Sequence, residues 1–188
     1  MLFTALLTVH LVGLVLGLGG ATIGDLGVLR SMVRHLPYPT DLLRDLSYVI
    51  WAGLAVLTAS GVALFVEKPS LYLHNSGFVA KLILVAVLMA NGVYLHRRLE
   101  RFTVGPVTLL AGAVSTVSWY GALIIAMFKT QVHLPLVAYL AIYVSAVLVT
   151  WVMYRSLHRQ VAGTLGREHL EDPMTVQSAA ATETRVSL

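Results

Sequence analysis

The amino-acid sequence predicts an all-α integral membrane protein, built as a bundle of five transmembrane helices. Three observations carry this prediction. Of the 188 residues, 57% are hydrophobic and only 12% are charged, which is far from the composition of soluble domains. Five apolar runs each approach the length of about 20 residues that a helix needs to cross a bilayer. The basic residues gather in alternate loops between these runs, as they do in membrane proteins of fixed orientation.

The expected helices follow the five apolar runs in order. The first run lacks a preceding basic segment and is too long for the apolar core of a typical secretory signal, so we expect a retained helix. The second is LSYVIWAGLAVLTASGVALFV and the third is GFVAKLILVAVLMANGVYLH. Pro106 and Pro135 stand near the starts of the last two, where a helix tolerates proline best. The predicted bounds are 2–23, 46–66, 77–96, 106–128 and 134–154.

The arginines predict the orientation of the bundle. They cluster after the first, third and fifth helices, whereas the other two loops carry only Lys68 and Lys129. The clusters are Arg30, Arg34 and Arg44, then Arg97, Arg98 and Arg101, then Arg155, Arg159 and Arg167. The positive-inside rule therefore places the N-terminus outside and the C-terminus in the cytoplasm. We expect residues 1–160 to form the transmembrane domain and residues 161–188 to form a polar, mobile cytoplasmic tail.

The composition also excludes several classes of function. The chain has no cysteine, so it has no disulfide, no thiolate metal site and no thiol nucleophile. Its net charge of +4 comes from residues at helix ends and does not indicate nucleic-acid binding. No HExxH motif and no pairing of a nucleophile with a base stands out, so zinc hydrolysis and nucleophilic catalysis are not predicted.

Two ionisable side chains lie inside predicted helices, where they are costly and mark functional sites by default. At 1.5 Å per residue, His10 lies roughly 12 Å below the outer edge of the first helix, and Lys81 roughly 6 Å below the outer edge of the third. Alternatively, Lys81 extends its ammonium group to the lipid headgroups, and His10 forms a hydrogen bond to a neighbouring helix. We expect His10 to be a cofactor or metal ligand, and Lys81 to be a second ligand or to face the bound group.

Other polar residues complete the candidate site. Trp119 and Tyr120 in the fourth helix are expected at about the depth of His10, as the wall of a cavity or as a plain helix interface. His74 and His133, near the outer surface, are alternative ligands or solvated loop residues. Asp25 follows the first apolar run and is expected to pair with Arg30 or to cap the next segment.

Glycines form a stripe along the first helix. Gly13, Gly17, Gly20, Gly24 and Gly27 recur at steps of four and three residues, which places all five on one helical face. Such a face allows either a neighbouring helix or a flat ligand to approach closely. We expect Gly13, Gly17 and Gly20 to face a cofactor.

These residues permit three kinds of function. Haem b is the leading hypothesis, because haem can be held by one axial histidine and a second ligand, and a glycine face leaves room for a flat group. Copper is the alternative, with His10, His74 and His133 as candidate ligands, because imidazole suits it. A structural or assembly subunit is the third, in which the glycines only pack against a partner helix.

A resemblance to a known superfamily supports the haem hypothesis. HLVGLVLGLGGATIGDLGVLR and GFVAKLILVAVLMANGVYLHRR, within residues 5–30 and 75–100, resemble segments of a loose superfamily of small bacterial membrane proteins. Its members include the copper-resistance D domain and the small membrane-type protoporphyrinogen oxidase. In that oxidase, which binds b-type haem, the functional pair is a histidine and a lysine at the positions of His10 and Lys81.

The resemblance implies a place in the bacterial inner (cytoplasmic) membrane. It also implies electron transfer or oxidoreduction, with a quinone, a porphyrin or a redox protein as partner. A homo-oligomer is a further candidate assembly, and nucleic acid is not an expected partner.

Overall fold

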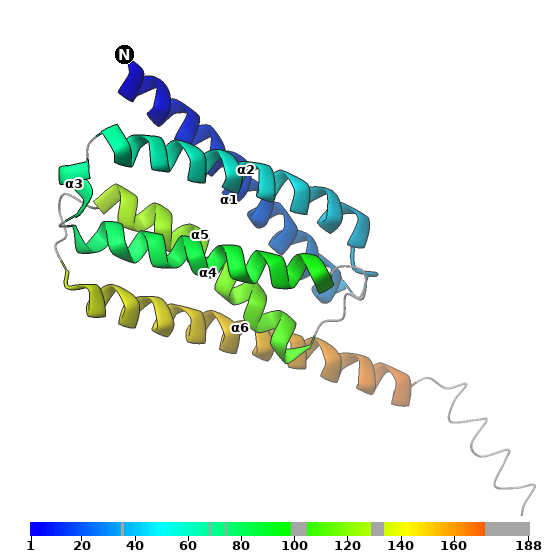
Figure 1. Ribbon diagram of the computed structural model, residues 1–188. Coiled ribbons are helices and arrows are strands. Elements are labelled where there is room, and N and C mark those ends of the chain that lie inside the picture. Colours follow the sequence, from blue (N-terminus) through cyan, green and yellow to red (C-terminus); the bar gives the residue numbers. More distant parts are fainter. Residues whose placement is uncertain (35, 68, 74, 99–104, 129–133, 172–188) are drawn as a thin grey trace, which may run out of the picture.

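The protein is all-helical in the part of the chain that the computed structural model describes, namely residues 1–34, 36–67, 69–73, 75–98, 105–128 and 134–171. Five of the described helices are long and apolar enough to cross a membrane, and α3 is a short helix of five residues between two of them (Figure 1). The predicted helical class and the five candidate spans are therefore confirmed. The helices are α1 (Leu2–Arg34), α2 (Thr40–Glu67), α3 (Pro69–Leu73), α4 (Ser76–Arg98), α5 (Pro106–Phe128) and α6 (Leu136–Glu171).

The helices extend beyond the apolar runs that predicted them. Only α5 keeps its predicted bounds. Helix α1 continues to Arg34, eleven residues past the expected end, because its polar continuation contains no proline before Pro37. Helix α6 runs to Glu171 and so includes the start of the expected tail, and residues 172–188 lie outside the described part of the chain.

The helices pack as a hairpin and a three-helix group. Helices α1 and α2 form the closest pair, and α5 packs between α4 and α6 (Figure 1). The hairpin meets the group where α1 contacts α5. Arg30 and Arg34 at the end of α1, Arg97 and Arg98 at the end of α4, and the arginines late in α6 all lie at one end of the bundle, since these three helices run in the same direction (Figure 1).

Glycines bring the backbones of α1 and α2 into contact. An ideal Cβ built on Gly53 would lie 2.5 Å from the Gly17 nitrogen, and one on Gly13 would lie 2.7 Å from the Leu57 nitrogen. No larger residue fits at either position without moving a helix. Small residues allow this close approach in membrane proteins, where van der Waals packing holds helices together.

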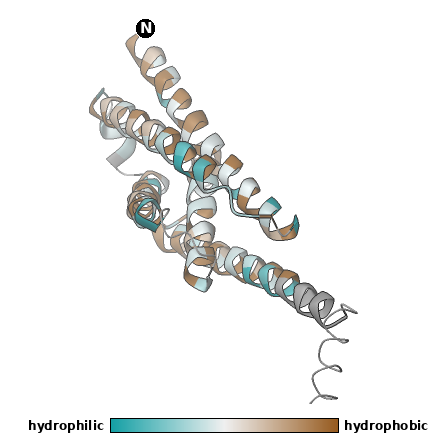
Figure 2. Cartoon of the chain, turned by 90° about the vertical axis from the view of Figure 1, so that its right-hand side faces the viewer, coloured by the Kyte–Doolittle hydropathy of each residue, from teal (hydrophilic) through white to brown (hydrophobic). Residues whose placement is uncertain are grey.

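Most residues along the helices are apolar (Figure 2). Large side chains such as Val15 of α1, Val62 of α2 and Val137 of α6 are more than half exposed. Such a surface suits contact with lipid tails better than contact with water. Figure 2 also shows hydrophilic residues gathered towards the helix ends.

Candidate functional site

The structure divides the predicted site residues into two groups. His10 and Lys81 lie together, in the half of the bundle away from the arginines. Trp119 and Tyr120 instead line a cavity in the half nearer the arginines, and His10 does not belong to its lining. Along α1, Trp119 packs against Gly17 and Tyr120 bonds to Thr22, well past His10, so the expectation that the aromatic pair shares the depth of His10 is wrong. Helix α1 begins at Leu2 as expected, but its first turns project past α2 (Figure 1), so counting residues from the helix ends does not give relative depth.

His10 is held in a defined orientation by α2. Its Nδ1 lies 3.0 Å from Ser60 Oγ, and that hydroxyl donates its own proton to the Val56 carbonyl at 2.6 Å. Ser60 Oγ therefore accepts a hydrogen bond from Nδ1–H, because it has no second proton to donate. A neutral His10 then carries its free lone pair on Nε2. A metal-binding histidine is oriented in the same way, by a hydrogen bond from its other ring nitrogen.

Lys81 lies near this imidazole, as the sequence predicts. Its ammonium, on α4, is close enough to interact electrostatically with His10 on α1. The other two predicted ligands, His74 and His133, lie outside the described residues. Within the ranges that the structure describes, no group of three or more His, Asp or Glu side chains is arranged to hold a metal ion.

The glycine stripe is filled by protein. Gly13 faces the backbone of α2, and Gly17 faces both α2 and the indole ring of Trp119. A Cβ on Gly20 would lie 3.0 Å from the Ile50 side chain. The stripe therefore packs helices together, with no space for a flat cofactor between these glycines and the described parts of α2 and α5. Gly13, Gly17 and Gly20 therefore do not fit the predicted role of a haem-facing surface.

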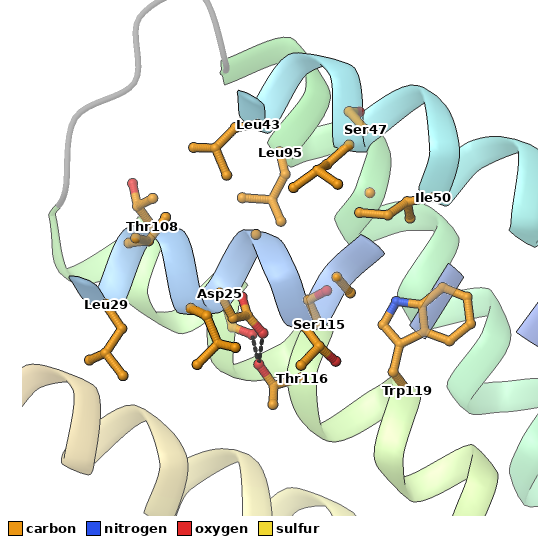
Figure 3. A pocket seen from close by; sticks show the side chains of 18 of the residues that line it. Asp25, Leu29, Leu43, Ser47, Ile50, Leu95, Thr108, Ser115, Thr116 and Trp119 are labelled. Atoms are coloured by element: carbon orange, nitrogen blue, oxygen red, sulfur yellow. Dashed lines mark hydrogen bonds between the residues drawn. The ribbon is translucent and has the colours of Figure 1, made fainter. Parts of the chain in front are cut away.

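A cavity of about 290 Å³ lies between the hairpin and the three-helix group (Figure 3). Five helices contribute to its walls, and most of the lining side chains are apolar. Leu54 and Leu88 are among the most deeply buried of these. Trp51 and Trp119 add two aromatic rings to the lining. The volume is close to the lower end of the range for small-molecule sites.

Asp25 is the carboxyl group of this cavity, and α5 holds it in place. Thr116 Oγ1 lies 2.7 Å from Asp25 Oδ2, and the dashed line in Figure 3 marks this bond. Thr116 Oγ1 also lies 3.0 Å from the Gly112 carbonyl oxygen and 3.3 Å from the Tyr154 hydroxyl oxygen. With Asp25 ionised, Thr116 donates to the carboxylate and accepts from Tyr154. With Asp25 protonated, the carboxyl donates to Thr116, which donates to Gly112, so the network accommodates both protonation states.

Two further hydrogen bonds join helices around the cavity. Tyr120, predicted as a cofactor contact, has its hydroxyl 3.0 Å from Thr22 Oγ1 and so links α5 to α1. Ser47 Oγ lies 3.0 Å from His96 Nδ1 and links α2 to α4. All four residues line the cavity. With Tyr154 of α6 counted as well, all five helices of the cavity contribute polar groups to its lining.

Sequence reasoning missed Asp25 as part of the site. The expectation of a pair with Arg30 assumed that the first helix ends before Asp25. In the structure α1 continues for nine more residues, and Asp25 bonds to Thr116 near the middle of α5. The absence of a proline or a polar run directly after Asp25 is the signal that points to a longer helix.

Comparisons of the chain with protein-family models, with curated proteins and with solved structures found no match. The superfamily resemblance of its first and third spans therefore stays a prediction.

Proposed function

We propose that this protein binds a lipophilic small molecule in the cavity between the α1–α2 hairpin and helices α4–α6. The observation that carries the proposal is the Asp25 carboxyl, which lines a mostly apolar cavity and is held there by Thr116. A carboxyl group within a membrane-spanning helix is costly, and such groups usually belong to a functional site. An apolar pocket with a few convergent polar groups is the general form of a ligand site.

The position of the cavity favours a ligand that arrives from the bilayer. Its α1 wall includes Leu26 and Leu29, which are 59% and 37% exposed on the outside of the bundle. A ligand that reaches the cavity past these side chains never has to leave an apolar environment. The positive-inside rule places the arginine end in the cytoplasm, so the cavity belongs to the inner half of a bacterial cytoplasmic membrane, with the N-terminus outside.

Binding of naphthalene to the purified protein tests this proposal. Isothermal titration calorimetry in detergent, with protein-free micelles as the blank, should show saturable binding at one site. Ser115→Phe places a ring in the cavity and should weaken binding at least about tenfold, because the cavity is little larger than a small ligand. Ala52→Phe, which adds the same ring on the exposed side of α2, is the matched control. Equal binding by both variants, or none by the unaltered protein, would overturn the proposal.

Haem b binding through His10 is the second candidate function. The observation that favours it is the hydrogen bond from His10 Nδ1–H to Ser60, which places the lone pair of the neutral ring on Nε2. Bound there, haem would supply one-electron chemistry, with Lys81 beside the ligand. The same nitrogen suits copper, which remains the alternative metal. If His10 binds neither, the outer half has a structural or assembly role.

A visible absorption spectrum separates these outcomes. Protein purified from haem-replete cells should show a Soret band that sharpens on reduction with dithionite, and His10→Ala should weaken or shift this band. A colourless protein would refute haem binding. Copper titration of that protein, with His10→Ala as the comparison, then separates the copper function from a structural one.

A further inference from the structure

Trp119 presents a buried hydrogen-bond donor that has no partner among the described residues. The residue is only 2% exposed, and its indole Nε1 makes no hydrogen bond to any described part of the chain. Buried donors in folded proteins nearly always have an acceptor, because an unpaired one forfeits the hydrogen bond that it makes with water in the unfolded chain. A group bound in the cavity would supply the missing acceptor.

The indole is fixed so that this donor belongs to the cavity. Its benzo ring lies directly against Gly17 of α1, where any side chain would collide with it. Figure 3 shows the nitrogen on the edge of the ring that faces the other lining side chains, which include Ser115 and Ile50. Nε1 itself is buried, so a group that enters the cavity accepts the Nε1–H bond once a neighbouring lining side chain moves aside.

We propose that the ligand is a lipophilic ring compound bearing a carbonyl oxygen, of the quinone class, and that Trp119 Nε1–H donates to that oxygen. This inference rests on the proposed function of the cavity. Thr116, which holds Asp25, precedes Trp119 on α5 by three residues, a rise of ~4.5 Å. A ring with oxygen atoms at opposite ends meets the indole donor at one end. At the other end it meets the Asp25 carboxyl group, which in its ionised form accepts a hydrogen bond from a hydroxyl group.

Other lipophilic ligands match these two groups less well. A lipid acyl chain has no acceptor and would leave the Trp119 N–H unpaired. A fatty acid carboxylate would place a second negative charge in the same apolar cavity as Asp25, which the low local polarity makes unfavourable. A neutral ring carbonyl satisfies the donor without adding charge.

A matched pair of probes isolates the carbonyl. 1,4-Naphthoquinone and naphthalene share their ring system and differ by two oxygen atoms. After correction for uptake by protein-free micelles, the unaltered protein should bind the quinone about three- to tenfold more tightly, as one added hydrogen bond allows. Trp119→Phe keeps an aromatic ring but removes the N–H, so it should abolish this preference. Trp151→Phe should retain it, because the Trp151 indole donates to the Pro106 carbonyl and does not line the cavity.

The outcomes separate this inference from the proposed function. Suppose that naphthalene binds, that Ser115→Phe abolishes this binding, and that the protein shows no preference for the quinone. This result overturns the inference and leaves the cavity function intact. If neither probe binds, both the inference and the proposed function are overturned.

A second, direct measurement does not depend on whether Trp119→Phe folds. The indole ¹H–¹⁵N signal of Trp119, assigned by elimination with Trp51→Phe and Trp151→Phe, should shift downfield with naphthoquinone but not with naphthalene. An unmoved signal at saturating quinone overturns the inference.

Discussion

The contact between α1 and α2 predicts that Gly53→Ala destabilises the protein, although alanine is the better helix former. The α1 atoms nearest to the new methyl group would be the Gly17 nitrogen at 2.5 Å, the Gly13 carbonyl oxygen at 2.8 Å and the Gly17 Cα at 2.9 Å. All three belong to the backbone, so no side chain can rotate away. The helices themselves must separate.

The distances set the size of the effect. Ordinary contact of a Cβ begins at 3.4 Å, so the backbones must move apart by ~0.9 Å at this point. A gap of that size forfeits about a quarter to a half of the dispersion attraction between facing atoms. Overpacking of a tight contact costs about 1–3 kcal/mol. We therefore expect Gly53→Ala to lower the free energy of unfolding by about 2 kcal/mol, net of the gain in helix propensity.

Gly19→Ala is the matched control, because a Cβ at Gly19 would meet nothing within 4 Å. This substitution should raise stability by up to about 1 kcal/mol, since alanine is favoured over glycine in a helix. Equilibrium unfolding in mixed micelles with increasing SDS measures both variants against the unaltered protein. If the two free energies of unfolding agree within about 0.5 kcal/mol, the backbones of α1 and α2 are not in contact at Gly53 and the reasoning fails.

Three more predictions concern other contacts and the orientation. Ser60→Ala removes the acceptor for His10 Nδ1–H, so ¹⁵N spectra of the neutral ring should change from one tautomer to a mixture; an unchanged spectrum would contradict the hydrogen-bond assignment. Thr116→Val keeps the shape of the side chain but removes the partner of the buried carboxyl. It should lower the free energy of unfolding by about 1–3 kcal/mol, and a change below about 0.5 kcal/mol would show that the bond contributes little. In this cysteine-free chain, an impermeant maleimide should label Ser70→Cys in intact cells but Gln160→Cys only after the membrane is opened, and the reverse pattern would invert the orientation.

The fold could be predicted from the sequence because the bilayer imposes one dominant pattern. Apolar runs long enough to span it have to be helices, since only a helix or a closed barrel satisfies the backbone there. The same reasoning predicts the ends of the helices poorly. Hydropathy falls after Ile23, but the helix continues to Arg34, because helix formation needs only the absence of a breaker and not an apolar environment.

The site was predictable in part. An intramembrane histidine and lysine stand out in any apolar sequence, and the structure does bring His10 near Lys81. The depth of Trp119 relative to His10 was not predictable, because it depends on how far α1 extends past its neighbours. The hydrogen bond between Asp25 and Thr116 was not predictable for a similar reason. It joins residues 91 positions apart, and it depends on the register of two tilted helices.

The glycine stripe has two functions that periodicity alone cannot separate. At Gly13 and Gly17 it meets the backbone of α2 and fixes the point where the two helices cross. Towards the arginine end a Cβ on Gly24 or Gly27 would first meet only side-chain atoms of α2 or of Pro39 just before it, at 3.5 Å, so the two backbones have diverged there. The cavity begins on this diverging side, with Gly24 of α1 and Leu43 of α2 in its lining. Close approach at one end of the stripe therefore determines the space at the other, and Gly53→Ala should change ligand affinity as well as stability.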